Sequence, residues 1–219
     1  MPTNKKIAVL ASGGLDSSIL IHHLSKKYRI VQPIYIQNGH IWEQAELVQL
    51  KKFLKATRNP RLRSLVLLSM PTQDLYQTHW SLTGKNIPGA KSHDKKVYLP
   101  GKNIFLIAKA SVFCALRKIH VLALGPLKTN PFPDASPSFF KNIGYVCSQG
   151  LNCKLKILTP FLNRSKKEVM KLGSKLPLEL TFSCLSPKGL SHCGGCNKCM
   201  ERKRAFRNVG IVDKTRYAR

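Results

Sequence analysis

Acidic side chains are scarce in this 219-residue sequence: ten Asp and Glu stand against 37 Lys and Arg, for a formal net charge of +27. A surplus of positive charge favours RNA or DNA as a partner, because Lys and Arg displace the counterions of phosphate. It also suits the attraction of anionic ATP. Since the basic residues are spread along the whole chain instead of forming one arm, we do not favour tRNA or another nucleic acid as the direct partner.

Long apolar runs and a leader-like segment are also missing. No apolar stretch approaches the ~20 residues needed to cross a bilayer, so we expect no membrane partner. The first residues, MPTNKK, lead straight into a strand-like stretch, so no secretory signal is evident. The seven cysteines are too few and too clustered for a disulfide scaffold. These features predict a reducing, cytoplasmic location and cysteines that bind metal or act in catalysis.

Short apolar runs alternate with longer segments of helical pattern, and hydrophobic residues make up 43% of the chain, enough for a core. We predict strands at residues 7–11, 29–36, 62–68, 121–124 and 155–158, and helices at residues 18–24, 42–55, 103–118 and 165–172. Such alternation predicts an α/β fold with a Rossmann-like parallel sheet. The last helix should begin with a capping box of Ser165 and Glu168. Residues 72–99 and 125–137 are expected to be loops.

The hexapeptide SGGLDS, residues 12–17, follows the first predicted strand and opens the first predicted helix. Gly13 and Gly14 let the backbone turn sharply and bring N–H groups close to an anion. The hydroxyls of Ser12 and Ser17 add donors, and the helix points its positive end at the same place. These features predict a pyrophosphate-binding loop, the alternative being a tight turn that happens to contain two glycines. Neither a Walker A site nor a dinucleotide site is expected, because the lysine of G-x-x-x-x-G-K-[ST] and the pattern G-x-G-x-x-G are both missing.

Four cysteines in the last part of the chain have the spacing C-x8-C-x2-C-x2-C, and they are Cys184, Cys193, Cys196 and Cys199. Two overlapping C-x2-C steps bring thiolates close enough to share a tetrahedral Zn²⁺. Because four protein ligands close the shell, the site is predicted to be structural, and the neighbouring His192 is not needed as a ligand. An iron–sulfur cluster and a disulfide pair are the alternatives.

The SGGLDS loop resembles the PP-loop of the N-type ATP pyrophosphatases, which activate a substrate as its adenylate. In that superfamily the loop holds the β and γ phosphates that leave as pyrophosphate. The resemblance implies that ATP is contacted by Leu10, Ala11, Ser12, Gly13, Gly14, Leu15, Asp16, Ser17 and Ser18. It implies catalytic roles for Ser12, Asp16 and Ser17. Asp16 would orient the loop or help to hold Mg²⁺.

Together with the cysteines, the loop narrows the resemblance to the 7-cyano-7-deazaguanine synthase family, over essentially the whole chain. The other matching stretches are LPGKN at 99–103, FPD at 132–134, LELTFSC at 178–184 and CGGCNKCMERKRAF at 193–206. The resemblance implies an adenine nucleotide alpha hydrolase-like domain at residues 1–180 and, at residues 181–219, a zinc-binding segment with four cysteine ligands and a basic helix. It also implies one Zn²⁺ per chain and, as in many members, a homodimer.

The same resemblance implies a small-molecule deazapurine acid and an amine donor as partners. ATP would adenylate 7-carboxy-7-deazaguanine, ammonia would displace AMP to give an amide, and a second activation would give the nitrile, preQ0. The enzyme would chiefly orient the reactants and stabilise the leaving pyrophosphate. Candidate substrate-binding residues are His40, Lys102, Asn103 and Asp134, each with a purely structural alternative as a satisfied, capping or turn residue. Trp42 is expected in the core rather than stacked on a base.

Departures from the family pattern cluster in the middle of the chain. A YGQRH-like stretch appears as YIQNGH at residues 35–40, and YPDCRPEF appears as FPDASPSF at residues 132–139. Ala135, Ser136 and Ser138 therefore replace a Cys, an Arg and a Glu. Because serine does not reproduce bidentate recognition of a carboxylate by arginine, we predict a divergent member whose acid is related to the family substrate, or whose amine is not ammonia.

Two other functions remain open at this point. One is a tRNA-modifying PP-loop enzyme, either a thiolase or a lysidine-type ligase, which the net charge of +27 motivates. Thiolation needs a persulfide-bearing cysteine, and only Cys147 and Cys153, which we place in a loop, could serve. The other is a non-enzymatic zinc-knuckle module that binds nucleic acid, against which the intact SGGLDS loop argues.

Overall fold

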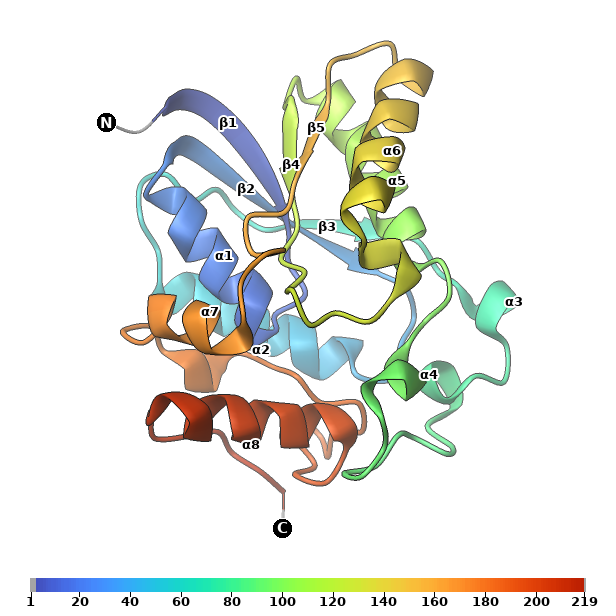
Figure 1. Cartoon of the computed structure of the whole chain (residues 1–219), viewed down its shortest axis with the longest axis vertical. Helices are drawn as coiled ribbons and strands as arrows, with labels where there is room; N and C mark the ends of the chain where they lie inside the picture. Colours follow the sequence, from blue (N-terminus) through green and yellow to red (C-terminus); the bar gives the residue numbers. More distant parts are fainter. Residues whose placement is uncertain (1–2, 219) are drawn as a thin grey trace.

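A fully parallel sheet of strand order β3-β2-β1-β4-β5 forms the centre of the computed structural model, which describes residues 3–218 (Figure 1). The strands are β1 (Thr3–Leu10), β2 (Tyr28–Gln37), β3 (Val66–Ser69), β4 (Val121–Ala123) and β5 (Lys156–Leu158). The longer helices are α1 (Leu15–Ser25), α2 (Glu43–Ala56), α5 (Lys102–Leu116), α6 (Pro137–Gly150), α7 (Lys166–Leu172) and α8 (Asn197–Val209). Short helical turns complete the chain: α3 (Gln73–Tyr76), α4 (Trp80–Thr83), η1 (Asp94–Val97), η2 (Pro133–Ala135) and η3 (Leu178–Leu180).

The apolar run in β1 is buried on both of its faces. Ile7 and Val9 belong to one hydrophobic cluster, which includes side chains of α1 and α7. Ala8 and Leu10 belong to a second cluster, which includes side chains of α5 and α6. Successive side chains of a strand point to opposite faces, so a continuous apolar run is what a central strand between two helical layers requires.

Helices cover both faces of the sheet, and α8 lies across one end of the molecule beside α7 (Figure 1). The chain moves outward from β1 to β3 in one direction and then from β4 to β5 in the other. Strand order therefore reverses between β1 and β4. In open α/β sheets, ligands bind in the crevice outside the carboxyl ends of the strands at such a reversal.

All five strands predicted from the sequence are present, and the capping box of α7 is confirmed. Ser165 N donates to Glu168 Oε2 at 2.7 Å, and Glu168 N donates to Ser165 Oγ at 3.3 Å. The segment at 72–99 is loop-rich as expected, with short turns in place of long elements. Within the described part of the chain, the helices are too short or too polar to cross a bilayer.

The sequence analysis missed α6, so its placement of Cys147 in a loop is wrong. The reason is local: Pro137 is the last residue of the loop predicted at 125–137. In the structure Pro137 occupies the first turn of α6, and Ser136 caps the helix by accepting a hydrogen bond from Phe139 N at 3.1 Å. Proline is favoured at this position because its missing N–H is not needed there.

Candidate functional site

The SGGLDS loop connects β1 to α1 at the carboxyl edge of the sheet. Gly13 has φ +71°, and a Cβ there would lie 3.2 Å from both the Cγ and the carbonyl oxygen of Glu46 on α2. Glycine is needed for the left-handed backbone and for this close approach of α2. The helix α2 therefore packs directly against the loop.

Two serine hydroxyls hold the loop in shape. Ser12 Oγ and Ser17 Oγ lie 3.0 Å apart, and Ser17 Oγ also accepts a hydrogen bond from Ser12 N at 3.2 Å. Gly14 precedes α1 in an extended conformation and contributes no side-chain cap. The first amide groups of α1 have no partner within the helix, so this end of α1 is suited to bind an anion.

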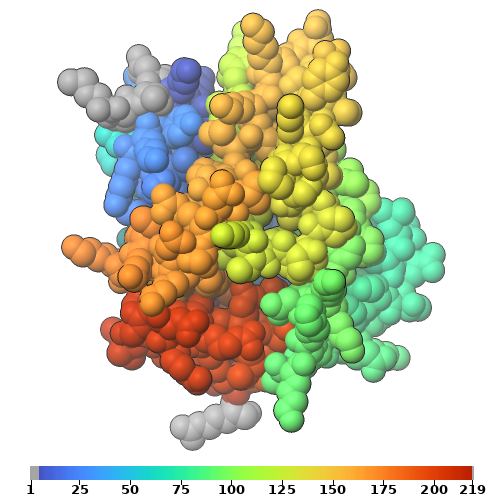
Figure 2. Space-filling model, in the orientation of Figure 1, coloured from blue at the N-terminus to red at the C-terminus, as the bar shows by residue number. Residues whose placement is uncertain are grey.

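The carboxyl-terminal segment completes the loop. Phe182 N donates a hydrogen bond to Gly13 O at 2.8 Å. Arg202 of α8, which is 1% exposed, supports this segment by donating to Leu178 O at 2.7 Å and to Thr181 Oγ1 at 2.8 Å. Figure 2 shows the red carboxyl-terminal segment packed against the orange segment around α7 and the green segment that precedes α5. The expected boundary at residue 180 stays a prediction, since residues on both of its sides build the loop.

A chain of ion pairs joins the loop to α8. Lys166 Nζ, at the start of α7, lies 2.9 and 2.8 Å from the two carboxylate oxygens of Asp16 and 3.3 Å from Glu201 Oε1. Lys198 Nζ lies 2.6 Å from Glu201 Oε2. Burial would raise the pKa of Glu201, but the charges of Lys198 and Lys166 outweigh it and hold that pKa at about 2. Asp16 therefore faces the site with its negative charge already paired.

Two cavities adjoin the loop. The first has a volume of about 950 Å³, open mouth included, and its apolar part is lined by Ile34, Ile36, Leu106, Leu124 and Phe140. The second, of about 900 Å³, is more aromatic, and its lining includes Trp42, Trp80, Tyr98, Phe132 and Asp134. Residues that line both cavities are Ser12, Gly14, Trp42, Glu46, Lys102, Asn103 and Asn130. The loop thus lies where two binding spaces meet.

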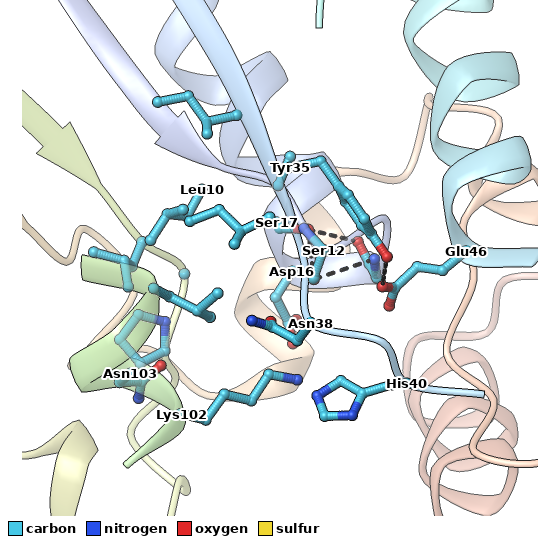
Figure 3. Close-up of a pocket in the computed structure, with 18 of the residues that line it drawn as sticks. Leu10, Ser12, Asp16, Ser17, Tyr35, Asn38, His40, Glu46, Lys102 and Asn103 are labelled. Carbon is cyan, nitrogen blue, oxygen red and sulfur yellow. Dashed lines mark hydrogen bonds between the residues drawn. The ribbon is translucent and has the colours of Figure 1, made fainter. Parts of the chain in front are cut away.

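The Lys102 side chain reaches toward the His40 ring (Figure 3), and both residues line the first cavity. The ammonium of Lys102 is 5.7 Å from the centroid of the Trp42 ring, and the His40 ring stacks on the same tryptophan at 4.7 Å. Burial, with the charge of Lys102, lowers the pKa of His40 to about 3, so its ring is neutral. Neither ring nitrogen of His40 has a hydrogen-bond partner among residues 3–218. Trp42 is buried as expected, yet it also lines both cavities.

Asp134 lines the second cavity, and one of its two carboxylate oxygens lacks a hydrogen-bond partner among the described residues. Its Oδ2 accepts a hydrogen bond from Asn103 N at 3.0 Å, and its main-chain oxygen accepts one from Asn103 Nδ2 at 2.8 Å. The other oxygen, Oδ1, is buried and has no partner within the described chain. Burial raises the pKa of Asp134, and the hydrogen bond from Asn103 opposes that rise. A buried acceptor without a donor is costly, so this geometry suits a ligand with an N–H group.

The four cysteines of the predicted zinc site come together. Their sulfur atoms all lie within 4.8 Å of one another, with Cys193 to Cys199 and Cys184 to Cys196 each at 3.9 Å. Tetrahedral Zn²⁺ with Zn–S bonds of about 2.3 Å separates its sulfurs by about 3.8 Å, so the cluster fits this ion. Backbone N–H groups of Cys193 and Cys196 donate to sulfur at 3.2 and 3.3 Å, which stabilises thiolates.

His192 lies outside this ligand set. Its Nε2 accepts a hydrogen bond from Ser183 N at 3.1 Å, and the ring packs 4.4 Å from the ring of Phe182. Burial, aided by the charge of Arg202, lowers the pKa of His192 to about 3. A neutral histidine with an occupied nitrogen orients the segment beside the loop and is not needed for the metal.

The residues at 135, 136 and 138 that depart from the family pattern lie away from the two cavities, whereas Tyr35, Ile36, Asn38 and His40 of the other departing stretch line the first cavity. Ser136 and Ser138 are near the start of α6, with their hydroxyls 3.1 Å apart, and Ala135 is buried beneath them. Within residues 3–218, none of the three lines either cavity. The cationic side chains that line the second cavity are Lys102 and Lys198. These lysines, rather than an arginine at residue 136, face the space that an acid would enter.

The structure gathers part of the predicted loop with His40, Lys102, Asn103 and Asp134 around the paired cavities, and the loop residues concerned are Leu10, Ala11, Ser12, Gly14, Asp16 and Ser17. Gly13, Leu15 and Ser18 are not among the residues that line these two cavities. Sequence reasoning missed Glu46, Tyr35 and Lys166. Glu46 accepts a hydrogen bond from the Tyr35 hydroxyl at 2.7 Å and lines both cavities. The available signal was an acidic residue one turn before Leu50, whose side chain is fully buried.

The sheet and its loop define the fold as an adenine nucleotide alpha hydrolase-like, PP-loop type. A solved structure described as a predicted subunit of a tRNA methyltransferase from Methanocaldococcus jannaschii superposes with a TM-score of 0.50 at 19% identity, over 78% of this chain and 75% of that chain. This likeness concerns the fold alone.

Sequence comparison defines the family. Residues 6–210 match the family described as "Queuosine biosynthesis protein QueC", and the chain belongs to that family. It is 30% identical to a 7-cyano-7-deazaguanine synthase of Leptospira interrogans, over 97% of this chain and 90% of that protein. It is 29% identical to a 7-cyano-7-deazaguanine synthase of Methanocaldococcus jannaschii, over 97% of this chain and 99% of that protein.

Proposed function

We propose that this chain is an ATP-dependent, AMP-forming ligase of queuosine biosynthesis. It activates the carboxylate of a 7-deazaguanine-type acid and makes a C–N bond, giving the amide and then the nitrile, 7-cyano-7-deazaguanine. The observation that carries this proposal is the position of the phosphate loop between two cavities of different character. Membership of the QueC family supports it.

ATP is assigned to the loop and the first cavity. The β and γ phosphates bind the hydroxyls of Ser12 and Ser17 and the open amides at the start of α1. Adenine occupies the apolar part of the first cavity. The predicted contact set for ATP is unchanged, and it consists of Leu10, Ala11, Ser12, Gly13, Gly14, Leu15, Asp16, Ser17 and Ser18. Mg²⁺ accompanies the phosphates, and Asp16 either helps to hold it or, paired with Lys166, orients the loop.

The deazapurine acid is assigned to the second cavity. Its flat ring system suits the aromatic lining, since Trp42 and Trp80 lie 5.7 Å apart there. Asp134 Oδ1 accepts N–H groups of the guanine-like edge, because an ionised carboxylate is an acceptor only. Lys102 then faces the acid's carboxylate at the meeting point with the first cavity. Two expectations stay predictions: a homodimer, and an amine donor whose identity is open.

Zn²⁺ is assigned to the four cysteines in a structural role. With four protein ligands the ion has no open position for substrate or water. It fixes the fold of residues 184–199, from which Asn197 Nδ2 donates to Ser92 O at 2.8 Å and to Asp94 Oδ1 at 3.0 Å. Zinc therefore holds the segment that precedes α5 beside the second cavity.

One incubation tests the proposed function. The protein is mixed with ATP, Mg²⁺, 7-carboxy-7-deazaguanine and ammonium, and the AMP and nucleobase products are measured by mass spectrometry. AMP with amide and nitrile is the expected result, and AMP with an unchanged acid pool would show hydrolysis of an adenylate that lacks its proper amine. Release of AMP only when tRNA is added would replace this proposal with tRNA modification. No AMP with any acceptor would refute both.

A further inference from the structure

The reacting atoms must meet where the two cavities join. In the proposed function, on which this inference rests, an oxygen of the acid attacks the α-phosphorus of ATP, and an amine then attacks the carbon of the resulting adenylate. The two substrates approach from different cavities, so both steps occur among the residues that line both. Of those residues, only Glu46 and Lys102 carry ionisable side chains.

The carboxylate of Glu46 is held in place with one oxygen free. Its Oε2 accepts the hydrogen bond of the Tyr35 hydroxyl at 2.7 Å. Its Oε1 accepts no hydrogen bond from the residues that the structure describes, and the side chain borders open cavity space. Figure 3 shows Tyr35 against Glu46, with the Lys102 side chain reaching toward the same space from α5. One oxygen is thus oriented by the protein while the other is available to a ligand.

We propose that Glu46 is the general base of the amine step. The lone pair of a neutral amine forms the C–N bond at the adenylate carbonyl carbon, and the C–O bond to AMP breaks, with AMP taking the electron pair. The proton leaves the attacking nitrogen for Oε1 of Glu46 and passes from there to solvent. Lys102 stabilises the negative charge that develops on the carbonyl oxygen.

The surroundings of Glu46 adapt it to this task. It is faced by Tyr35 from β2, Lys102 from α5, Glu43 from α2 itself and the backbone of Gly13 in the loop. Burial raises the pKa of Glu46 to about 7; Lys102 and the Tyr35 hydrogen bond oppose the rise, and Glu43 adds to it. A carboxyl group that titrates near neutral pH is well matched to take a proton and release it again.

His40 is the competing base, and its position argues against it. It lines the first cavity, not the second, and its neutral ring with a pKa of about 3 holds a proton poorly at neutral pH. Its unpartnered nitrogens fit a ligand contact instead. A His40→Gln variant is therefore useful for separating the two.

The test divides the reaction into its two steps. Acid-dependent exchange of pyrophosphate into ATP, measured without amine, reports adenylation, and amide yield after adding methoxyamine, which stays uncharged in this pH range, reports the second step. Glu46→Gln is expected to exchange within about threefold of wild type while its amide formation falls at least ~100-fold. The exposed Glu179→Gln is the matched control and should change neither.

The pH dependence of amide formation separates a general base from a residue with a structural role. A structural role for Glu46 would leave that dependence unchanged. Wild-type amide formation should rise with pH through about 7, as Glu46 loses its proton. Tyr35→Phe removes a hydrogen bond that stabilises the carboxylate, so the midpoint should move to higher pH. Glu46→Asp keeps a carboxyl group on a shorter side chain. Its amide formation should be faster than that of Glu46→Gln and should still rise with pH.

Three results would overturn the assignment. Amide formation at the wild-type rate in Glu46→Gln is one, and loss of exchange together with amide formation in this variant and in Glu46→Asp is another. A pH limb that disappears in His40→Gln and persists in Tyr35→Phe without a shift is the third. If the wild-type protein showed no acid-dependent exchange of pyrophosphate into ATP, the proposed function itself would be refuted.

Discussion

Lys166, the first residue of α7, donates to both carboxylate oxygens of Asp16 in the phosphate loop, at 2.9 and 2.8 Å, across 150 positions of sequence. Burial would lower the pKa of Lys166, but the charges of Asp16 and then Glu201 raise it, so the ammonium stays protonated. The loop is therefore charge-balanced before ATP arrives. A γ-phosphate that approaches Asp16 meets a neutral pair instead of an uncompensated carboxylate.

Removal of this lysine should weaken ATP turnover more than it weakens folding. Lys166→Met leaves Asp16 and Glu201 without their shared cation, and a charge-assisted hydrogen bond of this kind contributes about 1.5–3 kcal/mol. We expect AMP formation to fall about 10–100-fold, measured under saturating acid. Its exposed neighbour Lys167→Met is the control. Equal rates in the two variants would mean that the pair does not orient the loop.

Loss of one zinc ligand should release the metal and lower thermal stability. Cys199→Ser leaves three thiolates, and structural Zn²⁺ contributes folding free energy directly. We expect less than half an equivalent of zinc by elemental analysis and a Tm lower by on the order of 10 °C. Cys147→Ala on α6 is the control and should retain zinc. A brown, iron-containing wild-type protein would contradict the zinc assignment.

Substitution of Asp134 should weaken the binding of the acid and leave the binding of ATP unchanged. In Asp134→Asn the amide oxygen can still accept from Asn103 N, but an NH₂ group then takes the place of the unpartnered Oδ1. This NH₂ group would meet the N–H donors of a guanine-like edge, and two donors form no hydrogen bond. The KM for the acid should therefore rise about 10–100-fold. The KM for ATP should stay within about twofold. Asp74→Asn, exposed on α3, is the control, and a matching rise in both KM values would refute the assignment.

The free energy of unfolding should fall at low pH, because Glu201 becomes protonated there. Its folded pKa of about 2 lies below the usual 4.5, so its contribution is complete above pH 4.5 and is lost as pH falls from there toward 2. Because the side chain is 31% exposed, we expect the contribution to be only about 1–2 kcal/mol near pH 6. Urea midpoints of wild type and Glu201→Gln should differ at pH 6 and converge toward pH 3. A difference that is constant with pH would exclude this ion pair as the cause.

The sequence predicted those features whose chemistry is contained in a short stretch. The loop SGGLDS and the four cysteines carry their own turn geometry and donor atoms, so the phosphate loop and the metal cluster lie where the pattern indicated. Order along the chain also predicted the parallel sheet, because apolar runs and helices alternate.

The residues that sequence reasoning missed act through tertiary contacts. Nothing near Lys166 in the chain indicates that it pairs with Asp16, and Glu46 reaches the loop only because α2 crosses behind Gly13. The expectation that Ser136 replaces a substrate-binding arginine also ignored tertiary structure. Its position depends on α6, which was not predicted from the sequence, and there Ser136 serves as the helix cap.

The hydrogen bond from Phe182 N to Gly13 O has a consequence for how the enzyme is made. The loop leaves the ribosome early, but its last backbone partner is added 169 residues later, which corresponds to roughly 8–34 s of synthesis. A nascent or truncated chain that ends before residue 182 therefore carries an unfinished nucleotide site. The nucleotide loop therefore reaches its final form only after the segment around Phe182 has been made and has folded against Gly13.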